Sequence, residues 1–512
     1  MTGTTNVVKG LDRGTLIACC FAVAIAQMCI TVPTSINGAI TSEFGSSGAQ
    51  VAWVTSAFIL PTAILELNFG VVGDLFGRKR LLVLGGLVLA LGELVNATAQ
   101  SITQLWVGQG LAGVGAAMLF PSSLAVIAAA TPGEKQRSKA VATWSVSLSL
   151  ASAIGPLMSG VIANEANFRW VFVPPAVIGV IVSLVCWKYV TDSKAPRGRS
   201  LDWPGQITIA IALTALLWGV IEGSDTGFSN TGIIIALVVA VLGLIAFVWV
   251  ELRSASPMFN LQLLKIPSFA AAAGVALVGM LGFIGTAYSV SIRLGAVMHL
   301  DTLEASLPFV ILQSIPLLLA PVISRMLSQL EPRWLLIGGL LPMAAGQFWV
   351  AAIPIATTSL GAFIGPVLLL GVGFIFVVSS LTAAAVNAVP IELTGMASGA
   401  TSLVREFGQA LGPAVISAVA MSTASSALAG KLTGAGAVVN EAGGPLAVVN
   451  VPDVGEAAQL AAQNALGDGL AVGMVVCGCA SLAGVALTLI LVRKNEDRQV
   501  IEGSAAAEAS SA

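Results

Sequence analysis

Charged side chains are scarce in this sequence: Asp, Glu, Lys and Arg make up 9% of its 512 residues, and 56% are hydrophobic. A soluble globular protein carries roughly 25% charged residues, so most of this surface cannot face water. The single histidine, His299, has no second imidazole with which to hold a haem or a metal ion. A net charge of −2 removes the basic surface that nucleic-acid binding requires. We expect no enzyme, no catalytic residue, no metal, no cofactor and no nucleic-acid partner.

Two motifs that would indicate redox chemistry or ATP hydrolysis are also missing. No Cys-x-x-Cys pair occurs, which argues against metal or redox work. No Gly-x-x-x-x-Gly-Lys-Ser/Thr loop occurs either, so direct use of ATP is unsupported. All six cysteines fall inside apolar blocks, where we expect them to be small buried hydrophobes: Cys19, Cys20, Cys29, Cys186, Cys477 and Cys479.

Long apolar blocks fill the chain instead. About 20 apolar residues in a helix, at ~1.5 Å per residue, cross the ~30 Å hydrocarbon core of a bilayer. The first block follows Lys9 and Arg13, is too long for a signal-peptide core and lacks a cleavage site. We therefore predict an all-α polytopic membrane protein with fourteen transmembrane helices near 14–35, 51–72, 81–99, 104–130, 140–162, 170–190, 205–222, 232–251, 268–291, 306–324, 334–355, 360–384, 397–421 and 469–492.

The basic residues predict the orientation, because loops rich in Lys and Arg stay in the cytoplasm. With both termini placed in the cytoplasm, most Lys and Arg fall on the inner side; Arg169, Arg293 and Lys431 remain outside and Arg405 lies within a span. The outer stretch 422–468 has no assignable role, and a short surface helix is expected near 456–465. The predicted divisions are an N-terminal six-helix bundle at 1–190, a linker with inserted helices seven and eight at 191–267, a C-terminal six-helix bundle at 268–492 and a cytoplasmic tail at 493–512.

A glycine- and charge-rich loop joins the second and third blocks. A carboxylate beside a helix N-terminus is favoured, and glycine permits a tight turn. A merely topogenic turn explains the basic residues but not the spacing of the glycines and the aspartate. The loop resembles the signature of the major facilitator superfamily, Gly-x-x-x-Asp-x-x-Gly-Arg-Arg/Lys-Arg/Lys, which implies a conformational-switch role for Gly70, Gly73, Asp74, Gly77, Arg78, Lys79 and Arg80.

The fifth block carries a second motif, similar to one associated with the exporters of that superfamily. Small residues allow close helix packing, and proline removes a backbone hydrogen bond and can bend a helix. Ala151 and Ser159 stand where two glycines are usual, so close packing is retained. A structural kink is the simpler alternative. The resemblance implies that the antiporter motif consists of Gly155, Pro156 and Gly160.

Two further segments extend the resemblance to the fourteen-span drug:proton antiporters. Leu201 to Gly205 is similar to the entry to their inserted helix pair. Ser324 to Arg333 is similar to a decayed copy of the first loop motif, with Ser328 at the position of Asp74. Such a copy is expected in a fold built from two related halves. The implied fold is the major facilitator fold, with two six-helix bundles plus two inserted helices.

Two charges that this family usually carries are absent. In span one the usual Asp position holds Ala24, and in span four the usual Arg position holds Gln109. Their joint loss is physically coherent, because a buried unpaired charge is costly. It leaves other groups as the proton-coupling candidates within the spans, namely Glu406, Glu66 and Glu93.

Polar residues at helical spacing indicate a cavity lining. In span thirteen, Ser398, Ser402, Arg405, Gln409 and Gly412 share one face, while Glu406 points about 100° away and need not pair with Arg405. Purely structural alternatives stay open. Arg405 ties helix ends together, and Glu66 and Glu93 reach interfacial water. The aromatic side chains that pack against helices or anchor at the membrane interface, rather than stack on a solute, are Trp53, Trp106, Trp144 and Tyr288. The predicted substrate-cavity residues are Gln27, Thr31, Gln109, Arg405 and Gln409, with Thr34 continuing the span-one stripe.

The resemblance implies a secondary active exporter of lipophilic small molecules such as drugs, antiseptics or natural products, working by alternating access. Proton antiport, a plasma-membrane location, lipid as surrounding partner and a monomeric state complete this expectation. Alternatives are a facilitator-fold importer and a transporter without proton coupling. A proton-pumping respiratory subunit is a remote alternative, because no Lys lies at the centre of any predicted span.

Overall fold

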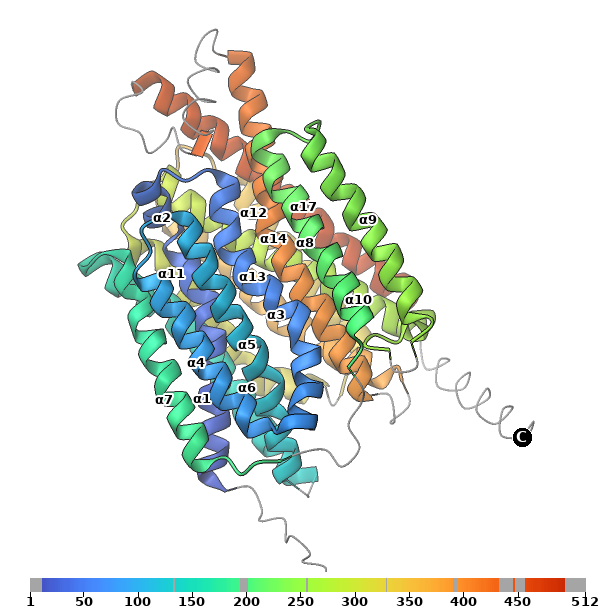
Figure 1. Cartoon of the computed structure of the whole chain (residues 1–512). Coiled ribbons are helices and arrows are strands. Elements are labelled where there is room, and N and C mark those ends of the chain that lie inside the picture. Colours follow the sequence, from blue (N-terminus) through green and yellow to red (C-terminus); the bar gives the residue numbers. More distant parts are fainter. Residues whose placement is uncertain are drawn as a thin grey trace, which may run out of the picture.

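The computed structural model describes residues 12–131, 134–193, 201–254, 257–327, 329–389, 394–431, 445–446 and 456–492. This part of the chain is almost entirely helical and forms no strand (Figure 1). Fourteen of its helices are long and apolar enough to cross a membrane. The predicted all-α fold with fourteen spans is confirmed. The orientation of the termini remains a prediction, and the cytoplasmic tail at 493–512 lies outside the described residues.

The first half begins at Asp12, whose side chain caps α1. Ser47 and Gln50 form a capping box that starts α3, and Gly77, with a φ of 112°, allows the chain to leave α3 and enter α4 at once. The helices are α1 (Arg13–Thr31), η1 (Val32–Ser35), α2 (Asn37–Phe44), α3 (Gly48–Phe76), α4 (Arg78–Ala97), α5 (Ile102–Ala130), α6 (Glu134–Glu165), η2 (Phe168–Phe172) and α7 (Val173–Tyr189).

The rest of the chain supplies the inserted pair and the second half. The short surface helix expected near 456–465 is wrong, because this segment is the beginning of one continuous membrane-length helix. The inserted pair is α8 (Trp203–Thr226) and α9 (Thr231–Glu251). The second half comprises η3 (Leu261–Lys265), α10 (Pro267–Ile292), η4 (Arg293–Val297), α11 (Thr302–Leu327), α12 (Pro332–Ala352), α13 (Gly361–Asn387), α14 (Thr394–Lys431) and α17 (Glu456–Leu491).

Two helix pairs join the halves: α3 packs along α14, and α6 packs along α11. Along the first pair, the Ser56 hydroxyl donates to the Ala410 carbonyl at 3.1 Å. Near the start of α3, Gly38 of α2 and Gly295 of η4 approach so closely that neither has room for a side chain. We call this the Gly38 end of the bundle and the opposite one the Arg78 end.

The inserted pair lies on one side of the bundle (green in Figure 1). Helix α8 contacts both α3 and α14, so it covers the seam between the halves. Helix α9 packs on α8 and leaves large apolar side chains exposed, including Ile235, Leu242 and Ile245. In water such a surface would be costly, whereas in hydrocarbon it is the expected outer face of a spanning helix.

Corresponding glycines pack corresponding helices in the two halves. In the first half, Gly85 of α4 faces Gly115 of α5; in the second, Gly339 of α12 faces Gly373 of α13. The register of the two loop motifs, which places Ser328 opposite Asp74, also places Gly339 opposite Gly85. The helix pairs α4–α5 and α12–α13 are therefore related copies, as expected for a fold with internal repeats.

The cysteines follow their predicted role with one exception. Five of the six are buried, and Cys479 on α17 is exposed. The exception arises because an apolar residue of a membrane-spanning helix can face lipid as well as the protein interior.

Candidate functional site

The loop between α3 and α4 is held by an ion pair. Arg78 Nη2 lies 2.7 Å from Asp74 Oδ1 and its Nη1 donates to the Ala125 carbonyl at 3.1 Å. The Lys79 backbone N–H donates to Asp192 Oδ1 at 3.3 Å, just beyond the end of α7. These contacts connect parts of the first half with one another and with the residues that directly follow α7, and none reaches the second half. Of the predicted switch residues, Arg80 is exposed, and Gly70 and Gly73 pack beside α5 near Pro121 and Ser122.

Helix α6, which carries the second motif, touches both halves through its two glycines. A methyl group at Gly155 would overlap the Thr31 hydroxyl of α1, in the same half. One at Gly160 would overlap the Ser306 hydroxyl of α11, in the opposite half. Pro156 lies between them inside the helix. The motif therefore places a proline-bearing helix in close contact with one element of each half.

Arg405, Glu406 and Glu66 form a charged cluster at the seam between the halves. Arg405 Nη2 lies 2.9 Å from Glu406 Oε1, and Gln409 Nε2 donates to the same oxygen at 3.4 Å. The expectation that Glu406 need not pair with Arg405 is wrong, because the long arginine side chain reaches back to its neighbour's carboxylate. Glu66 on α3 interacts electrostatically with both residues of α14.

The side chains of this cluster are only partly buried. The Glu406 side chain is 6% exposed and that of Arg405 is 30% exposed, while Glu66 is half-buried. In the part of the chain that the structure describes, Arg405 Nε and Glu406 Oε2 have no hydrogen-bond partner. Spare donor and acceptor capacity is therefore present at the boundary that must change if the halves move. The side chain of Ser398, from the predicted polar stripe, lies outside the described residues.

Glu93 lies inside the first half, away from water. The residue is 1% exposed, so the alternative that it reaches interfacial water is wrong. Asn96 Nδ2 donates to Glu93 Oε2 at 3.4 Å, and the Cys29 thiol of α1 donates a second hydrogen bond to the carboxylate. A carboxylate on α4 is thus joined to α1, the helix that packs against Gly155.

The remaining predicted lining residues belong to the first half. Thr31 is buried, and its hydroxyl donates to the Met28 carbonyl. Gln109 on α5 is 0% exposed, and neither polar atom of its amide has a hydrogen-bond partner among the described residues. Gln27 is half-buried on α1. A buried amide without hydrogen-bond partners is costly. Gln109 is therefore the lining candidate that would gain most from a hydrogen-bonding partner.

The four aromatic residues considered for stacking on a solute are hydrogen bonded within the described part of the protein. Trp53 Nε1 donates to Glu222 Oε1 at 2.9 Å, Trp106 Nε1 donates to the Gln50 carbonyl, and the Tyr288 hydroxyl donates to the Gly48 carbonyl. Trp144 likewise donates to Ser123.

Sequence reasoning missed the two polar residues that fasten the inserted pair. The first is Glu222 of α8, which accepts the hydrogen bond from Trp53. The second is Gln206 of α8, whose Nε2 donates a hydrogen bond to the Ile64 carbonyl at 2.7 Å. Both residues reach α3. Each stands at the edge of an apolar block, which was the available signal, but their partners lie far away in sequence.

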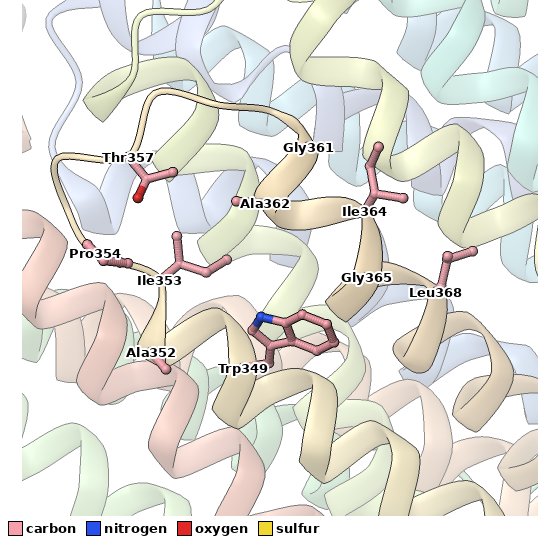
Figure 2. A pocket seen from close by; sticks show the side chains of 10 residues that line it. All are labelled: Trp349, Ala352, Ile353, Pro354, Thr357, Gly361, Ala362, Ile364, Gly365 and Leu368. Atoms are coloured by element: carbon pink, nitrogen blue, oxygen red, sulfur yellow. The ribbon is translucent and has the colours of Figure 1, made fainter.

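A pocket in the described residues lies away from the predicted site residues. Figure 2 shows it beside the connection between α12 and α13, with the Trp349 indole forming one wall. It holds about 600 Å³ and contains none of the predicted site residues. Two of its lining residues, Ile364 and Leu368, belong to the exposed apolar surface. The lining residues are Trp349, Ala352, Ile353, Pro354, Thr357, Gly361, Ala362, Ile364, Gly365 and Leu368.

Fourteen membrane-length helices, two repeated halves and two inter-half seams define a multi-pass membrane protein of the transporter type. The sequence matches the profile of the Major Facilitator Superfamily over residues 18–413. The chain therefore belongs to the major facilitator superfamily, whose members are transporters and not enzymes.

Curated relatives carry names of drug and antibiotic exporters. The chain is 30% identical to the multidrug resistance protein Stp of Mycobacterium tuberculosis, over 73% of this chain and 69% of that protein. It is 27% identical to the multidrug efflux pump LfrA of Mycolicibacterium smegmatis, over 89% and 91% respectively. It is 26% identical to the tetracenomycin C resistance and export protein of Streptomyces glaucescens, over 80% and 76%.

Solved structures confirm the fold. A bacterial homologue of the human lysosomal transporter Spinster superposes with a TM-score of 0.66 at 16% identity, covering 94% of this chain and 98% of that one. A POT family peptide transporter gives a TM-score of 0.61 at 16% identity, with coverage of 94% and 98%. The predicted major facilitator fold is confirmed.

Proposed function

We propose that this protein exports lipophilic small molecules, such as drugs, antiseptics or natural products, across the plasma membrane in exchange for protons. The names of the three relatives above, as drug resistance, efflux and export proteins, support export. The two halves rock about a central site and open it alternately to each side. The protein works as a monomer with both termini in the cytoplasm, and the Arg78 end faces inward.

The position of α6 is the observation that carries this proposal. Gly155 contacts α1 and Gly160 contacts α11, so a single proline-bearing helix touches both bodies that must move. Small residues permit close helix contact without interlocking side chains, so such a seam can slide. At the Gly38 end the halves already touch through Gly38 and Gly295.

The loop motif at the Arg78 end supplies the complementary latch. Asp74 pairs with Arg78 inside the first half, which leaves the loop as one preformed unit. When the Arg78 end closes, this charged unit meets the second half. Substitution of Asp74 therefore changes the rate of switching more than the affinity for substrate.

Efflux measurements test this proposal. Ethidium transport into everted membrane vesicles is compared for the native protein and Asp74→Asn, together with growth inhibition by a panel of lipophilic cations and antibiotics. We expect transport by the native protein, accompanied by proton movement in the opposite direction, and a lower turnover with similar ethidium affinity for Asp74→Asn. Ethidium movement in the importing direction would contradict export. Transport of every panel compound without proton movement would contradict proton antiport.

A further inference from the structure

Glu93 and Gln347 occupy equivalent positions in the two halves. The register that aligns Ser328 with Asp74 and Gly339 with Gly85 also aligns Gly346 with Gly92 and Gln347 with Glu93. Gly92 packs against α5, and Gly346 packs against α13. Both polar residues are buried, at 1% and 0% exposure. Each is hydrogen bonded to the first helix of its half, Glu93 to α1 and Gln347 to α10.

The second half satisfies this position with a neutral side chain. Gln347 Nε2 donates to the Thr286 hydroxyl at 3.3 Å, and the Ser481 hydroxyl donates to Gln347 Oε1 at 2.8 Å. Both polar atoms of the amide therefore have partners. The fold needs a polar side chain at this point between helices, and an amide is sufficient. A carboxyl group at the same point in the first half is not required by packing.

The surroundings of Glu93 suit both of its protonation states. The Cys29 thiol and Asn96 Nδ2 are donors, as an ionised carboxylate requires. Asn96 Oδ1 has no hydrogen-bond partner among the described residues and can accept a hydrogen bond from the carboxylic acid after rotation of the amide. Gly108 of α5 is needed here, because any side chain at that position would overlap Asn96 Oδ1.

Glu93 also lacks the counter-charge that the other two candidates have. Glu406 pairs with Arg405, and Glu66 interacts with the same arginine. Within the described residues, no Lys or Arg pairs with Glu93. A paired carboxylate loses an ion pair when it binds a proton, whereas an isolated buried one loses none.

The helices packed against α4 present few titratable groups to this position. Cys29 comes from α1. Helix α5 contributes Gly108 and Ala112, which pack on Gly92. Helix α7 contacts α4 earlier along that helix, where Gly179 and Ser183 pack on Gly86. Arg169 of η2 is directed to Glu43 and to the Ala99 carbonyl, and Asp74 of α3 pairs with Arg78 at the far end of α4.

We propose that Glu93 is the residue that binds and releases the exchanged proton, with Cys29 and Asn96 as its positioning residues. This proposal rests on proton antiport as the proposed function. Helix α1 connects the site to the moving seam: Cys29 faces Glu93, whereas Thr31, two residues later, points to roughly the opposite side of α1 and packs on Gly155. Gly160, on the same helix as Gly155, packs on Ser306. Movement of α6 against α1 therefore changes the access of water to Glu93, and water access decides whether a buried carboxyl can ionise.

The decisive variant is Glu93→Gln, which copies the side chain that the second half carries. The purified protein is reconstituted in liposomes, and two ethidium fluxes are measured: accumulation driven by a pH gradient at clamped membrane potential, and exchange of internal for external ethidium without a gradient. We expect Glu93→Gln to exchange ethidium at the native rate, while its gradient-driven accumulation falls to that of protein-free liposomes. Glu165→Gln, at an exposed glutamate where α6 ends, is the matched control and should retain both fluxes.

A conservative variant separates proton binding from packing. Glu93→Asp keeps a carboxyl group, so accumulation should persist with a displaced pH dependence. Native gradient-driven accumulation by Glu93→Gln would overturn the assignment of Glu93 and leave proton antiport intact. Loss of both fluxes in Glu93→Gln together with an undisplaced pH dependence in Glu93→Asp would show a packing role and also overturn it. Failure of the native protein to couple ethidium to protons would instead overturn the proposed function.

Discussion

The carboxylate of Glu66 on α3 and the guanidinium of Arg405 on α14 attract each other across the boundary between the two halves. Arg405 also pairs with Glu406 on its own helix, at 2.9 Å. The Arg405 guanidinium thus interacts with one carboxylate in each half. A shift of α3 along α14 changes the distance from Glu66 to Arg405, but Arg405 and Glu406 move together.

Arg405→Gln should destabilise the protein, because it leaves two carboxylates at the seam without a counter-charge. Removing one partner of a buried ion pair costs about 3–5 kcal/mol, and partial exposure of Arg405 reduces this to about 1–3 kcal/mol. Thermal unfolding in detergent measures the effect. The double variant Arg405→Gln with Glu406→Gln should recover part of the loss; if it is less stable than the single variant, the ion pair is not what Arg405 contributes.

Gly160→Ala should slow transport, because the added methyl group overlaps Ser306 where α6 meets α11. Overpacking of this kind costs about 1–3 kcal/mol. Ethidium flux in everted vesicles is the measurement, and Ser306→Gly in the same chain should restore it by removing the obstructing side chain. Gly338→Ala is the matched control, since nothing lies within 4 Å of a side chain there. A slow double variant would show that the Gly160–Ser306 contact is not limiting.

Gln109→Leu should leave the protein as stable as the native chain, or more stable, because it removes a buried amide whose two polar atoms have no partner. If Gln109 lines the substrate path, ethidium affinity should change at the same time. Unfolding temperature and ethidium binding, measured on the same preparation, check both results. A stable variant with native ethidium affinity would remove Gln109 from the substrate path.

Gln206→Leu should loosen the inserted pair, because the hydrogen bond from α8 to the Ile64 carbonyl is lost. The expected cost is about 1 kcal/mol, read as a lower unfolding temperature. Gln262→Leu is a suitable control, since this glutamine is exposed. Equal effects of the two substitutions would mean that the buried hydrogen bond does not fasten α8 to α3.

The sequence by itself determined the number of spans, because twenty apolar residues in a row have few alternatives to crossing a membrane. It also revealed the loop from Gly70 to Arg80 and the glycine–proline pair in α6, since short local motifs fold locally. The division at residues 190 and 267 and the orientation remain predictions. Local reasoning failed for Glu406, whose partner depends on side-chain reach, and for the start of α17.

Tertiary structure alone decided which buried polar groups meet. Asn96 lies three residues from Glu93 on the same helix, but Cys29 meets Glu93 only because α4 lies beside α1, and no spacing within one helix reveals a partner on another. The same holds for the hydrogen bond between Trp53 of α3 and Glu222 of α8. In a chain with so few charges, hydrophobicity places every helix in the membrane but does not choose its neighbours; packing of small residues and a few hydrogen bonds make that choice.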